Sequence, residues 1–399
     1  MSDKIRVAVV VSHPIQHFVH LYRALALEPG IELLVIYACD IGARRYFDRD
    51  MGVEIAWKTD LFSGYRSIVL EESPRIERIS FWQVNNPSVT AALESFRPQA
   101  VLLHGYAQLT LLRALMWCRR RRIPAMLWSD SSLSFRRPLF KRVAKKILIN
   151  MAMRQFGAVL TTGDNNAAYY RHYGVPETRL FRCPFTVDEA GLIAARRSRA
   201  ALHKSMRERY RIADDAFVLL FVGKLTSIKR PFDILDALHL IDGPRLEELK
   251  LVAFFAGDGP LRGELEARAS ELGSPAIFGG FINVDVLPSI YAMADALVFP
   301  SGFEPYGLAA REAVCIGLPL IVSDQIGCIG PGDAARTGIN ALVYPAGDVH
   351  ALTQAMVALA SDPQRLRHMG EASLGICEQL SLRNSVSGVL NAVEALAGA

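Results

Sequence analysis

The chain has 399 residues, of which 51% are hydrophobic and 21% are charged, enough to build two or three domains with buried cores. This composition excludes an intrinsically disordered chain. None of the apolar runs approaches the roughly 20 residues that a membrane-spanning helix needs, so an integral membrane protein is not expected. The net charge of +5 is uneven: residues 1–200 hold 29 Lys and Arg against 17 Asp and Glu, and residues 201–399 hold 16 against 23. A basic half followed by an acidic half indicates two domains with different partners.

The N-terminal residues and the cysteines favour a cytoplasmic protein. The first apolar run is too short for a signal peptide and has no small-residue cleavage site after it. The six cysteines form no Cys-x-x-Cys pair and have no histidine at zinc spacing, which predicts buried, reduced thiols. They are Cys39, Cys118, Cys183, Cys315, Cys328 and Cys377.

In the first half, short β-branched runs alternate with helical patterns. Strands that alternate with helices and are apolar on both faces indicate a buried parallel sheet with right-handed crossovers. The expected strands are Ile5–Val11, Ile31–Ala38, Ala100–Leu103, Ala125–Trp128 and Ala158–Thr161. The expected helices are Ile15–Leu27, Leu109–Arg121, Leu139–Arg154 and Asn165–Tyr173.

A second alternation of strands and helices begins after a polar, Arg-rich stretch, Ala194–Arg211, which resembles a domain boundary and could hold a helix of its own. The expected strands are Phe217–Val222, Leu251–Ala256, Leu297–Phe299 and Leu320–Val322, and the expected helices are Pro231–Leu240, Pro260–Leu272, Leu308–Ile316 and Val349–Ala360. We therefore predict an α/β protein with a doubly wound domain over residues 1–190, a linker over 191–212, and a second doubly wound domain over 213–378. A last helix over 379–399 is expected to pack back on the first domain. Ligands of such sheets bind outside the carboxyl ends of the strands, so the cleft between the domains is the expected site.

The loop after the first strand of the second domain is the first candidate site. Lys224 follows Gly223 at the strand end, and Lys229 precedes a helix whose first turn is fixed by Pro231. Two cations and a helix N-terminus on one loop suit a diphosphate. A solvated basic loop explains the same residues equally well.

The next strand also runs directly into a helix, through Gly257-Asp258-Gly259-Pro260. Asp258 is placed to cap that helix. A tight turn that contacts no ligand is the simpler interpretation of this segment.

The most informative motif places Glu304 and Glu312 eight residues apart around a helix N-terminus, with Gly317 and Pro319 as a stop signal. Eight helical residues span about 12 Å and put both carboxylates near one face. Between them, the backbone N–H groups of Tyr306, Gly307 and Leu308 could meet phosphate or sugar oxygens. Two glutamates that merely face solvent are the alternative.

In their order, these motifs resemble the retaining family 4 glycosyltransferases of GT-B fold. The resemblance covers about residues 217–344 and rests on Gly223-Lys224-Leu225 with Lys229, Gly257-Asp258-Gly259-Pro260, Gly280-Phe281, and the Glu304 to Glu312 frame. It implies two facing Rossmann-like domains with an interdomain cleft, with a nucleotide-sugar donor in the C-terminal domain and the acceptor in the N-terminal domain.

The resemblance also implies roles for donor-side residues. Lys224 and Lys229 would hold the diphosphate, and Glu312 would bind the ribose hydroxyls. Glu304 and the backbone after it, at Tyr306, Gly307 and Leu308, would bind the donor sugar near its reacting carbon. The base would lie against Gly280, Phe281 and Ile282. Gly257 and Asp258 would also belong to the donor site.

The chain departs from the family pattern at three places. Lys224 stands where the family usually has Arg, which keeps the charge but loses bidentate geometry. The first strand is followed by His13-Pro14-Ile15-Gln16 in place of a Gly-rich loop, so His13 and Gln16 are the acceptor-side candidates. Asp130 stands where members often have His, while His104 matches another frequent His. Either His104 or Asp130 would orient the acceptor hydroxyl, or neither would.

No metal and no other cofactor is expected, because the lysines and a helix N-terminus would neutralise the diphosphate. The only counter-signal is Asp48-Arg49-Asp50, an Asp-x-Asp far in sequence from the phosphate elements. Such a pair holds a cation in a different glycosyltransferase fold, but a lone Asp-x-Asp is common.

The basic half contains an amphipathic segment, Arg137–Lys146, in which cations alternate with apolar residues. A helix of this kind can lie on an anionic membrane surface, or it can bury its apolar face in the domain and solvate its charges. Both interpretations stay open. Nucleic acid is not an expected partner, because no aromatic platform or reader motif accompanies the charge.

The sequence thus predicts a glycosyltransferase, cytoplasmic or peripheral on the cytoplasmic face of a membrane, that uses a nucleotide sugar and a glycan or lipid-linked acceptor in glycoconjugate or polysaccharide synthesis. Two alternatives keep the fold. One is a nucleotide-sugar 2-epimerase, which needs no acceptor, and the other is a non-catalytic nucleotide-sugar-binding subunit.

Overall fold

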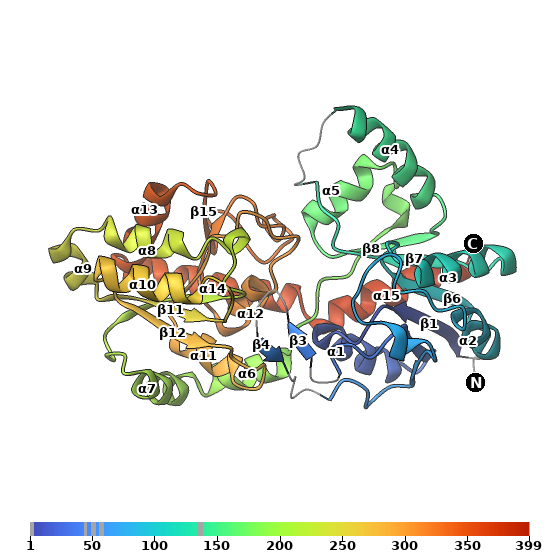
Figure 1. Ribbon diagram of the computed structural model, residues 1–399, viewed down its shortest axis with the longest axis horizontal. Coiled ribbons are helices and arrows are strands. Elements are labelled where there is room, and N and C mark those ends of the chain that lie inside the picture. The colour runs from blue at the N-terminus through green and yellow to red at the C-terminus, as the bar shows by residue number, and fades with distance from the viewer. Residues whose placement is uncertain (1–3, 44–45, 49–52, 56–59, 134–138, 399) are drawn as a thin grey trace. The chain divides into compact units, whose positions relative to one another are not determined.

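The chain is divided into two compact units in the computed structural model, which describes residues 4–43, 46–48, 53–55, 60–133 and 139–398 (Figure 1). Side chains are described for these ranges except at 46–48, 53–55 and 139–145. Unit 1 comprises residues 1–46, 59–187 and 381–399, and unit 2 comprises residues 47–58 and 188–380.

Unit 1 is built on a parallel sheet of seven strands in the order β5-β2-β1-β6-β7-β8-β9. Its central strands are buried on both faces: Val9, Leu102 and Leu127 are fully inaccessible to solvent. This explains their continuous apolar sequence. The strands are β1 (Ile5–Val11), β2 (Ile31–Tyr37), β5 (Ser67–Val69), β6 (Ala100–His104), β7 (Ala125–Trp128), β8 (Ala158–Thr161) and β9 (Leu180–Arg182). A separate pair is formed by β3 (Tyr46–Asp48) and β4 (Val53–Ile55), which fall in unit 2 except for Tyr46.

The helices that accompany this sheet are α1 (Gln16–Ala26), α2 (Val89–Phe96), α3 (Leu109–Arg121), α4 (Leu139–Met153), α5 (Asp164–His172) and α15 (Leu382–Ala397). The last of these comes from the far end of the chain and packs against β8, β9 and α1 (Figure 1). The contact is close because Gly388 lies directly on the backbone of β9: a Cβ there would be 2.0 Å from the Arg182 carbonyl oxygen. Ser385 Oγ also donates to the Pro184 carbonyl oxygen at 2.8 Å.

Unit 2 is built on a parallel sheet of six strands in the order β12-β11-β10-β13-β14-β15. The strands are β10 (Phe217–Val222), β11 (Leu251–Ala256), β12 (Ala276–Gly280), β13 (Ala296–Phe299), β14 (Leu320–Ser323) and β15 (Ala341–Tyr344). Its helices are α6 (Glu189–Arg197), α7 (Arg199–Tyr210), α8 (Phe232–His239), α9 (Gly243–Leu249), α10 (Arg262–Leu272), α11 (Leu287–Met293), α12 (Leu308–Ile316), α13 (Val349–Ala360) and α14 (Pro363–Gln379). Both sheets are the doubly wound, α/β arrangement that the alternating pattern predicts.

The structure differs from the sequence expectation over residues 191–212. This stretch is not a linker but the helices α6 and α7, which belong to unit 2. The physical reason is Arg207, which is 1% exposed and donates to the carbonyl oxygens of Met293 and Ala216 and to the Asp295 carboxylate. A buried charge with several acceptors fixes the helix to the unit, whereas its sequence is as polar as a linker's.

Candidate active site

The loops that follow β10 and β11 lie side by side at the carboxyl edge of the unit 2 sheet. Gly223 N–H donates to the Ala256 carbonyl at 3.1 Å, and Leu225 N–H donates to the Asp258 carbonyl at 2.9 Å. Gly257 is required for this approach, because a Cβ at that position would be 1.9 Å from the Gly223 carbonyl oxygen. The glycines of the two motifs therefore serve to bring two strand ends into backbone contact.

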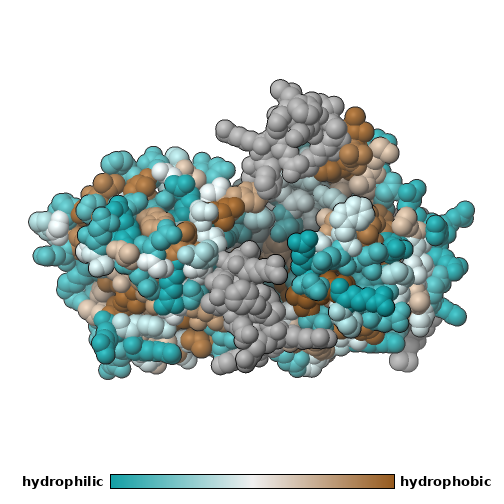
Figure 2. Space-filling view, in the orientation of Figure 1, coloured by the Kyte–Doolittle hydropathy of each residue, from teal (hydrophilic) through white to brown (hydrophobic). Residues whose placement is uncertain are grey.

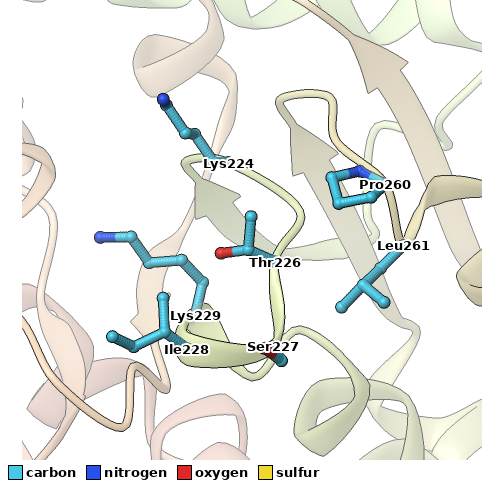
Figure 3. A pocket seen from close by; sticks show the side chains of 7 residues that line it. All are labelled: Lys224, Thr226, Ser227, Ile228, Lys229, Pro260 and Leu261. Atoms are coloured by element: carbon cyan, nitrogen blue, oxygen red, sulfur yellow. The ribbon is translucent and has the colours of Figure 1, made fainter. Parts of the chain in front are cut away.

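These loops border a pocket of about 520 Å³ lined by Lys224, Thr226, Ser227, Ile228, Lys229, Pro260 and Leu261. Figure 3 shows the side chains of Lys224 and Lys229 on the same side of the loop that follows β10, with Pro260 and Leu261 across the pocket from them. The structure thus brings together the two cations that the sequence selects as diphosphate ligands.

A left-handed residue separates this loop from the helix that follows it. Ser227–Lys229 form a short 3₁₀ turn, Arg230 adopts a left-handed conformation with φ of 51°, and α8 begins at Phe232. Arg230 pairs with Asp233 in the first turn of α8 at 2.8 Å. The α8 N-terminus is therefore separated from Lys229 by Arg230 and Pro231 and has its own carboxylate.

Lys229 and Glu304 form an ion pair in which both side chains are mostly buried, with exposures of 20% and 16%. The Lys229 ammonium also lies 5.2 Å from the centre of the Phe299 ring, at the end of β13. Glu304 is held by its backbone, since its N–H donates to the Gln325 carbonyl at 3.2 Å and its carbonyl accepts from Gly327 N–H at 2.9 Å. The lysine expected to hold the diphosphate and the carboxylate expected to bind the sugar therefore form one ion pair.

Glu304 and Glu312 do not share a helix, contrary to the expectation from their spacing. Helix α12 begins at Leu308, and Gly307 precedes it with φ of 112°, a conformation that favours glycine. Glu304 lies before this turn, in a bridge beside Ile326. Only Glu312 lies in the helix, so the distance between the two carboxylates is not the two helical turns that their spacing predicts. The N-terminus of α12, at Gly307 and Leu308, still lies between the two carboxylates in sequence.

Glu312 accepts a hydrogen bond from the Tyr291 hydroxyl at 2.7 Å. Burial raises the pKa of this carboxyl from 4.5 to about 7, against the opposing effects of Tyr291 and Arg311. Its protonation therefore changes near neutral pH. Sequence reasoning did not identify Tyr291, because nothing local marks a tyrosine on another helix as a partner of Glu312.

Asp258 does not cap the following helix. Its carboxylate accepts from Gly259 N–H at 2.8 Å and pairs with Arg262 at 2.8 Å, while α10 begins only at Arg262. Gly257 N–H donates to the Gly280 carbonyl at 2.9 Å, so Phe281 and Ile282 begin directly beside this turn. These donor-site candidates thus gather at the ends of β11 and β12.

The acceptor-side candidates all lie in unit 1, at the carboxyl ends of its strands. His13 and Gln16 follow β1, His104 ends β6, and Asp130 follows β7. Asp130 is exposed on a loop that Asn166 holds by donating to the carbonyls of Ser129 and Ser131, at 3.0 and 2.7 Å.

His104 is packed into an aromatic cluster. Its ring centre lies 4.5 Å from that of Phe18 and 5.1 Å from that of Trp128, and its Nε2 is 3.1 Å from the Tyr22 hydroxyl. Burial lowers the pKa of His104 to about 3 and that of His13 to about 4, so both rings are neutral at physiological pH. A neutral His104 can exchange hydrogen bonds with Tyr22 but is a weak base. The aromatic partners were not selected from the sequence, where they are indistinguishable from core residues.

The metal signal of the sequence lies outside the described side chains, since these exclude Asp48 and Asp50. Among the side chains that are described, no three His, Cys, Asp or Glu residues are placed to hold a metal ion.

The amphipathic segment Arg137–Lys146 is described only in part. The backbone is described from Leu139, and side chains only from Lys146 onward. The next residues of α4 are unexpectedly exposed: Ile147 by 57%, Leu148 by 67% and Met151 by 58%. Figure 2 shows hydrophobic surface over α4, beside the atoms drawn in grey. No helix in the described ranges is both long and apolar enough to cross a membrane.

The two Rossmann-like parallel-sheet units are those of the GT-B fold, which the similarity to solved glycosyltransferase structures supports. The chain is similar to Alr3699/HepE of Anabaena, crystallised in complex with UDP and glucose, with a TM-score of 0.71 over 98% of this chain and 99% of that chain at 16% identity. It is also similar to WaaG, a glycosyltransferase involved in lipopolysaccharide biosynthesis, with a TM-score of 0.60 over 98% of this chain and 100% of that chain at 15% identity.

Residues 203–374 match the model of the family Glycosyl transferases group 1. Among curated proteins it is 31% identical over 228 residues to a D-inositol 3-phosphate glycosyltransferase of Geodermatophilus obscurus, which is 54% of this chain and 49% of that protein. It is 35% identical over 137 residues to an uncharacterised glycosyltransferase of Methanocaldococcus jannaschii, which is 34% of this chain and 33% of that protein. The chain thus spans between a third and about half the length of these curated relatives.

Proposed function

We propose that this chain is a retaining, metal-independent glycosyltransferase that moves a sugar from a nucleotide-sugar donor to a glycan or lipid-linked acceptor in glycoconjugate or polysaccharide synthesis. The observation that carries the proposal is the meeting of Lys229 with Glu304 beside the pocket that Lys224 also lines. A diphosphate and a sugar are the two groups that such neighbouring charges suit. UDP is the first nucleotide to test, because Alr3699/HepE was crystallised with it.

The reaction breaks the bond between the anomeric carbon and a diphosphate oxygen, which leaves positive charge on the sugar ring and negative charge on the diphosphate. Lys224 and Lys229 stabilise the leaving diphosphate by charges that are already in place. Glu304, the ion-pair partner of Lys229, accepts hydrogen bonds from hydroxyl groups of the donor sugar beside the reacting carbon. The acceptor hydroxyl attacks on the leaving-group face and gives its proton to a diphosphate oxygen, which retains the configuration.

A thermal-shift screen across nucleoside diphosphates, followed by turnover assays of the matching nucleotide sugars, tests this proposal. A ligand at 100 times its Kd stabilises the folded protein by about 2.7 kcal/mol. Donor turnover should persist in chelator. Activity that is lost in chelator and restored by Mg²⁺ or Mn²⁺ would contradict metal independence and return attention to Asp48 and Asp50. Nucleotide release with a changed sugar and no acceptor would indicate an epimerase, and donor binding without turnover would indicate a binding subunit.

The donor KM should depend on pH through Glu312. Ribose hydroxyls donate to a carboxylate, so donor binding requires the ionised form of Glu312. Because the carboxyl has a pKa of about 7 in the folded protein, the donor KM should rise as the pH falls through 7. Glu312→Gln should raise the KM and remove this dependence between pH 6 and 8. A wild-type KM that is flat across this range would contradict the ribose assignment.

Glu312→Gln weakens donor binding but should increase the stability of the folded protein at high pH. A carboxyl whose pKa is raised on folding lowers stability as the pH rises from 4.5 to about 7, and the penalty is constant above 7. Glu312→Gln should therefore be more stable than wild type at pH 8, by at most about 3 kcal/mol, and the difference should vanish near pH 4. Thermal unfolding across this pH range measures it and also shows that a weaker donor affinity does not come from unfolding.

We propose that α4 places unit 1 on an anionic membrane surface, as a peripheral partner on the cytoplasmic face. Exposed Ile147, Leu148 and Met151 lie within one turn of α4, and the exposed cations Lys146 and Arg154 flank them. Apolar side chains that point to solvent beside basic residues match the boundary between anionic headgroups and acyl chains. This exposure favours the membrane interpretation over a helix that buries these residues in the domain.

Liposome flotation tests the membrane proposal. Each Lys or Arg near an anionic surface contributes about 1 kcal/mol and is screened by salt. Replacing Lys141, Arg142, Lys145 and Lys146 by Gln should lower the partition coefficient onto anionic vesicles about a hundredfold or more, and raising salt should weaken wild-type binding.

Two further variants separate the apolar contribution from general surface effects. Ile147→Ser with Leu148→Ser and Met151→Ser should also release the protein, because these side chains enter the interface. Leu240→Ser with Ile339→Ser, at exposed apolar positions of unit 2, should not. Equal recovery on neutral and anionic vesicles would refute the proposal.

A further inference from the structure

Helix α12 carries a buried arginine next to Glu312. Arg311 is fully inaccessible to solvent, although a guanidinium is among the groups that are most costly to bury. Such a residue is stabilised by the acceptors that its donors find, so the partners of the two Nη atoms of Arg311 indicate which segments it holds together.

The partners come from two segments distant in sequence from α12. The Nη2 atom donates to a Glu189 carboxylate oxygen at 2.5 Å and to the Leu380 carbonyl oxygen at 2.6 Å. The Nη1 atom donates to the thiols of Cys315 and Cys377, at 2.6 and 3.4 Å. Glu189 supplies the balancing charge, and it is largely buried with 16% exposure.

Glu189 and Leu380 are the second and the last residues of the main segment of unit 2. The chain enters this segment at Asp188, directly before α6, and leaves it after Leu380, directly before α15. The Arg311 guanidinium on α12 therefore binds both ends of this segment: Glu189 in the first turn of α6, and Leu380 at its last residue.

We propose that Arg311 is a positioning residue of the donor site, which fixes α12 and thereby Glu312 to both ends of the unit 2 segment. This inference rests on the proposed function, because it takes Glu312 as the ribose ligand. Arg311 acts on Glu312 through geometry and through charge. The groups facing Glu312 are the Tyr291 hydroxyl from α11, Asp188 before α6 and Arg311 itself; Arg311 favours the carboxylate, and Asp188 opposes it.

Steady-state kinetics of Arg311→Met, Arg311→Lys and Glu189→Gln test the inference. Arg311→Met should raise the donor KM about tenfold or more, with a smaller change in kcat per folded molecule. It should also move the midpoint of the KM–pH profile above 7, because the carboxylate of Glu312 loses a neighbouring cation. Arg311→Lys should restore the midpoint but only part of the KM, since lysine keeps the charge without the two-pronged geometry.

Glu189→Gln keeps the size of the side chain and leaves Arg311 in place, so it should fold even where Arg311→Met does not. It should speed amide hydrogen exchange across Leu308–Ile316 and raise the donor KM. Arg336→Met is the matched control: Arg336 donates to Gln379, the neighbour of Leu380, at 2.6 Å and to the Asp333 carbonyl at 3.2 Å, and both acceptors lie outside α12. Arg336→Met should have the donor KM of the wild type and the same midpoint in its KM–pH profile.

The outcomes separate the two proposals. Wild-type protein that binds no nucleoside diphosphate would overturn the proposed function. Wild-type protein that binds the nucleotide, together with Glu189→Gln and Arg311→Lys variants whose KM, pH midpoint and α12 exchange are unchanged, would overturn the positioning role of Arg311. An equal effect of Arg336→Met would overturn it as well, since the effect would then be a general loosening of unit 2.

Discussion

Glu304→Ala should lower kcat by about a hundredfold or more, while the donor KM changes little. Glu304 is placed beside Lys229, where in the proposed reaction the sugar gains positive charge and the diphosphate gains negative charge. A carboxylate at that point interacts more strongly with the transition state than with the bound donor. Loss of one preorganised electrostatic group of this kind typically costs about 10²–10³ in kcat. Steady-state kinetics, corrected for the folded fraction by circular dichroism, measure the effect.

Glu312→Ala is the comparison variant, because the two carboxylates are expected to affect different kinetic parameters. Glu312 would touch the ribose, which is remote from the bond that breaks, so its contact is alike in the ground and transition states. Its loss should mainly raise the donor KM. If both carboxylates were only structural, both variants would lose activity in proportion to the loss of folded protein, and the correction for the folded fraction would restore it. A Glu304→Ala enzyme with near-wild-type kcat would show that Glu304 does not act at the sugar centre.

The sequence was sufficient where the signals are local. The strand ends at Gly223 and Gly257 were predicted, because apolar runs followed by glycine mark a buried strand that turns sharply. The pocket that Lys224 and Lys229 line is formed by the loops that begin at these strand ends. The end of α12 at Ile316 was also predicted, from Gly317 and Pro319.

The sequence was insufficient where a partner comes from elsewhere in the fold. The spacing of Glu304 and Glu312 indicated one helix face, yet the left-handed turn at Gly307 separates them. The partner of Glu312 is Tyr291, on a helix about 20 residues earlier, and no periodicity marks it. Arg207 made α7 look like a solvated linker, since a buried arginine and an exposed one are identical in sequence.

The acceptor side shows the same limit. His104 was selected because it ends a strand, and its position at the carboxyl edge of the unit 1 sheet is as expected. Its packing between Phe18 and Trp128 lowers its pKa to about 3. Ring packing depends on two strands and a helix meeting in space, which a linear pattern does not encode. The chemistry of a histidine is therefore less predictable than its location.

Lys229→Met should have the second large effect, a loss of kcat/KM on the order of 10³-fold. It removes one of two cations that would neutralise the leaving diphosphate, so both donor binding and transition-state stabilisation suffer. It also leaves Glu304 without its ion-pair partner. Breaking a fully buried pair costs about 3–5 kcal/mol, and since both side chains keep some exposure, the loss of unfolding free energy should be smaller. Donor kinetics and denaturant unfolding measure the two consequences separately.

A double substitution separates the electrostatic role of Lys229 from its structural one. Lys229→Met with Glu304→Gln should recover most of the lost stability, because no charge is then left unpaired, while kcat/KM stays at or below the level of the single variant. Lys250→Met is the control, since Lys250 forms an ion pair with Asp215 whose side chains are 52% and 61% exposed. Exposed pairs contribute about 0–1 kcal/mol, so this variant should match wild type in kinetics. Recovery of activity along with stability in the double variant would mean that Lys229 only balances Glu304, and the diphosphate would then depend on Lys224 and the backbone of its loop.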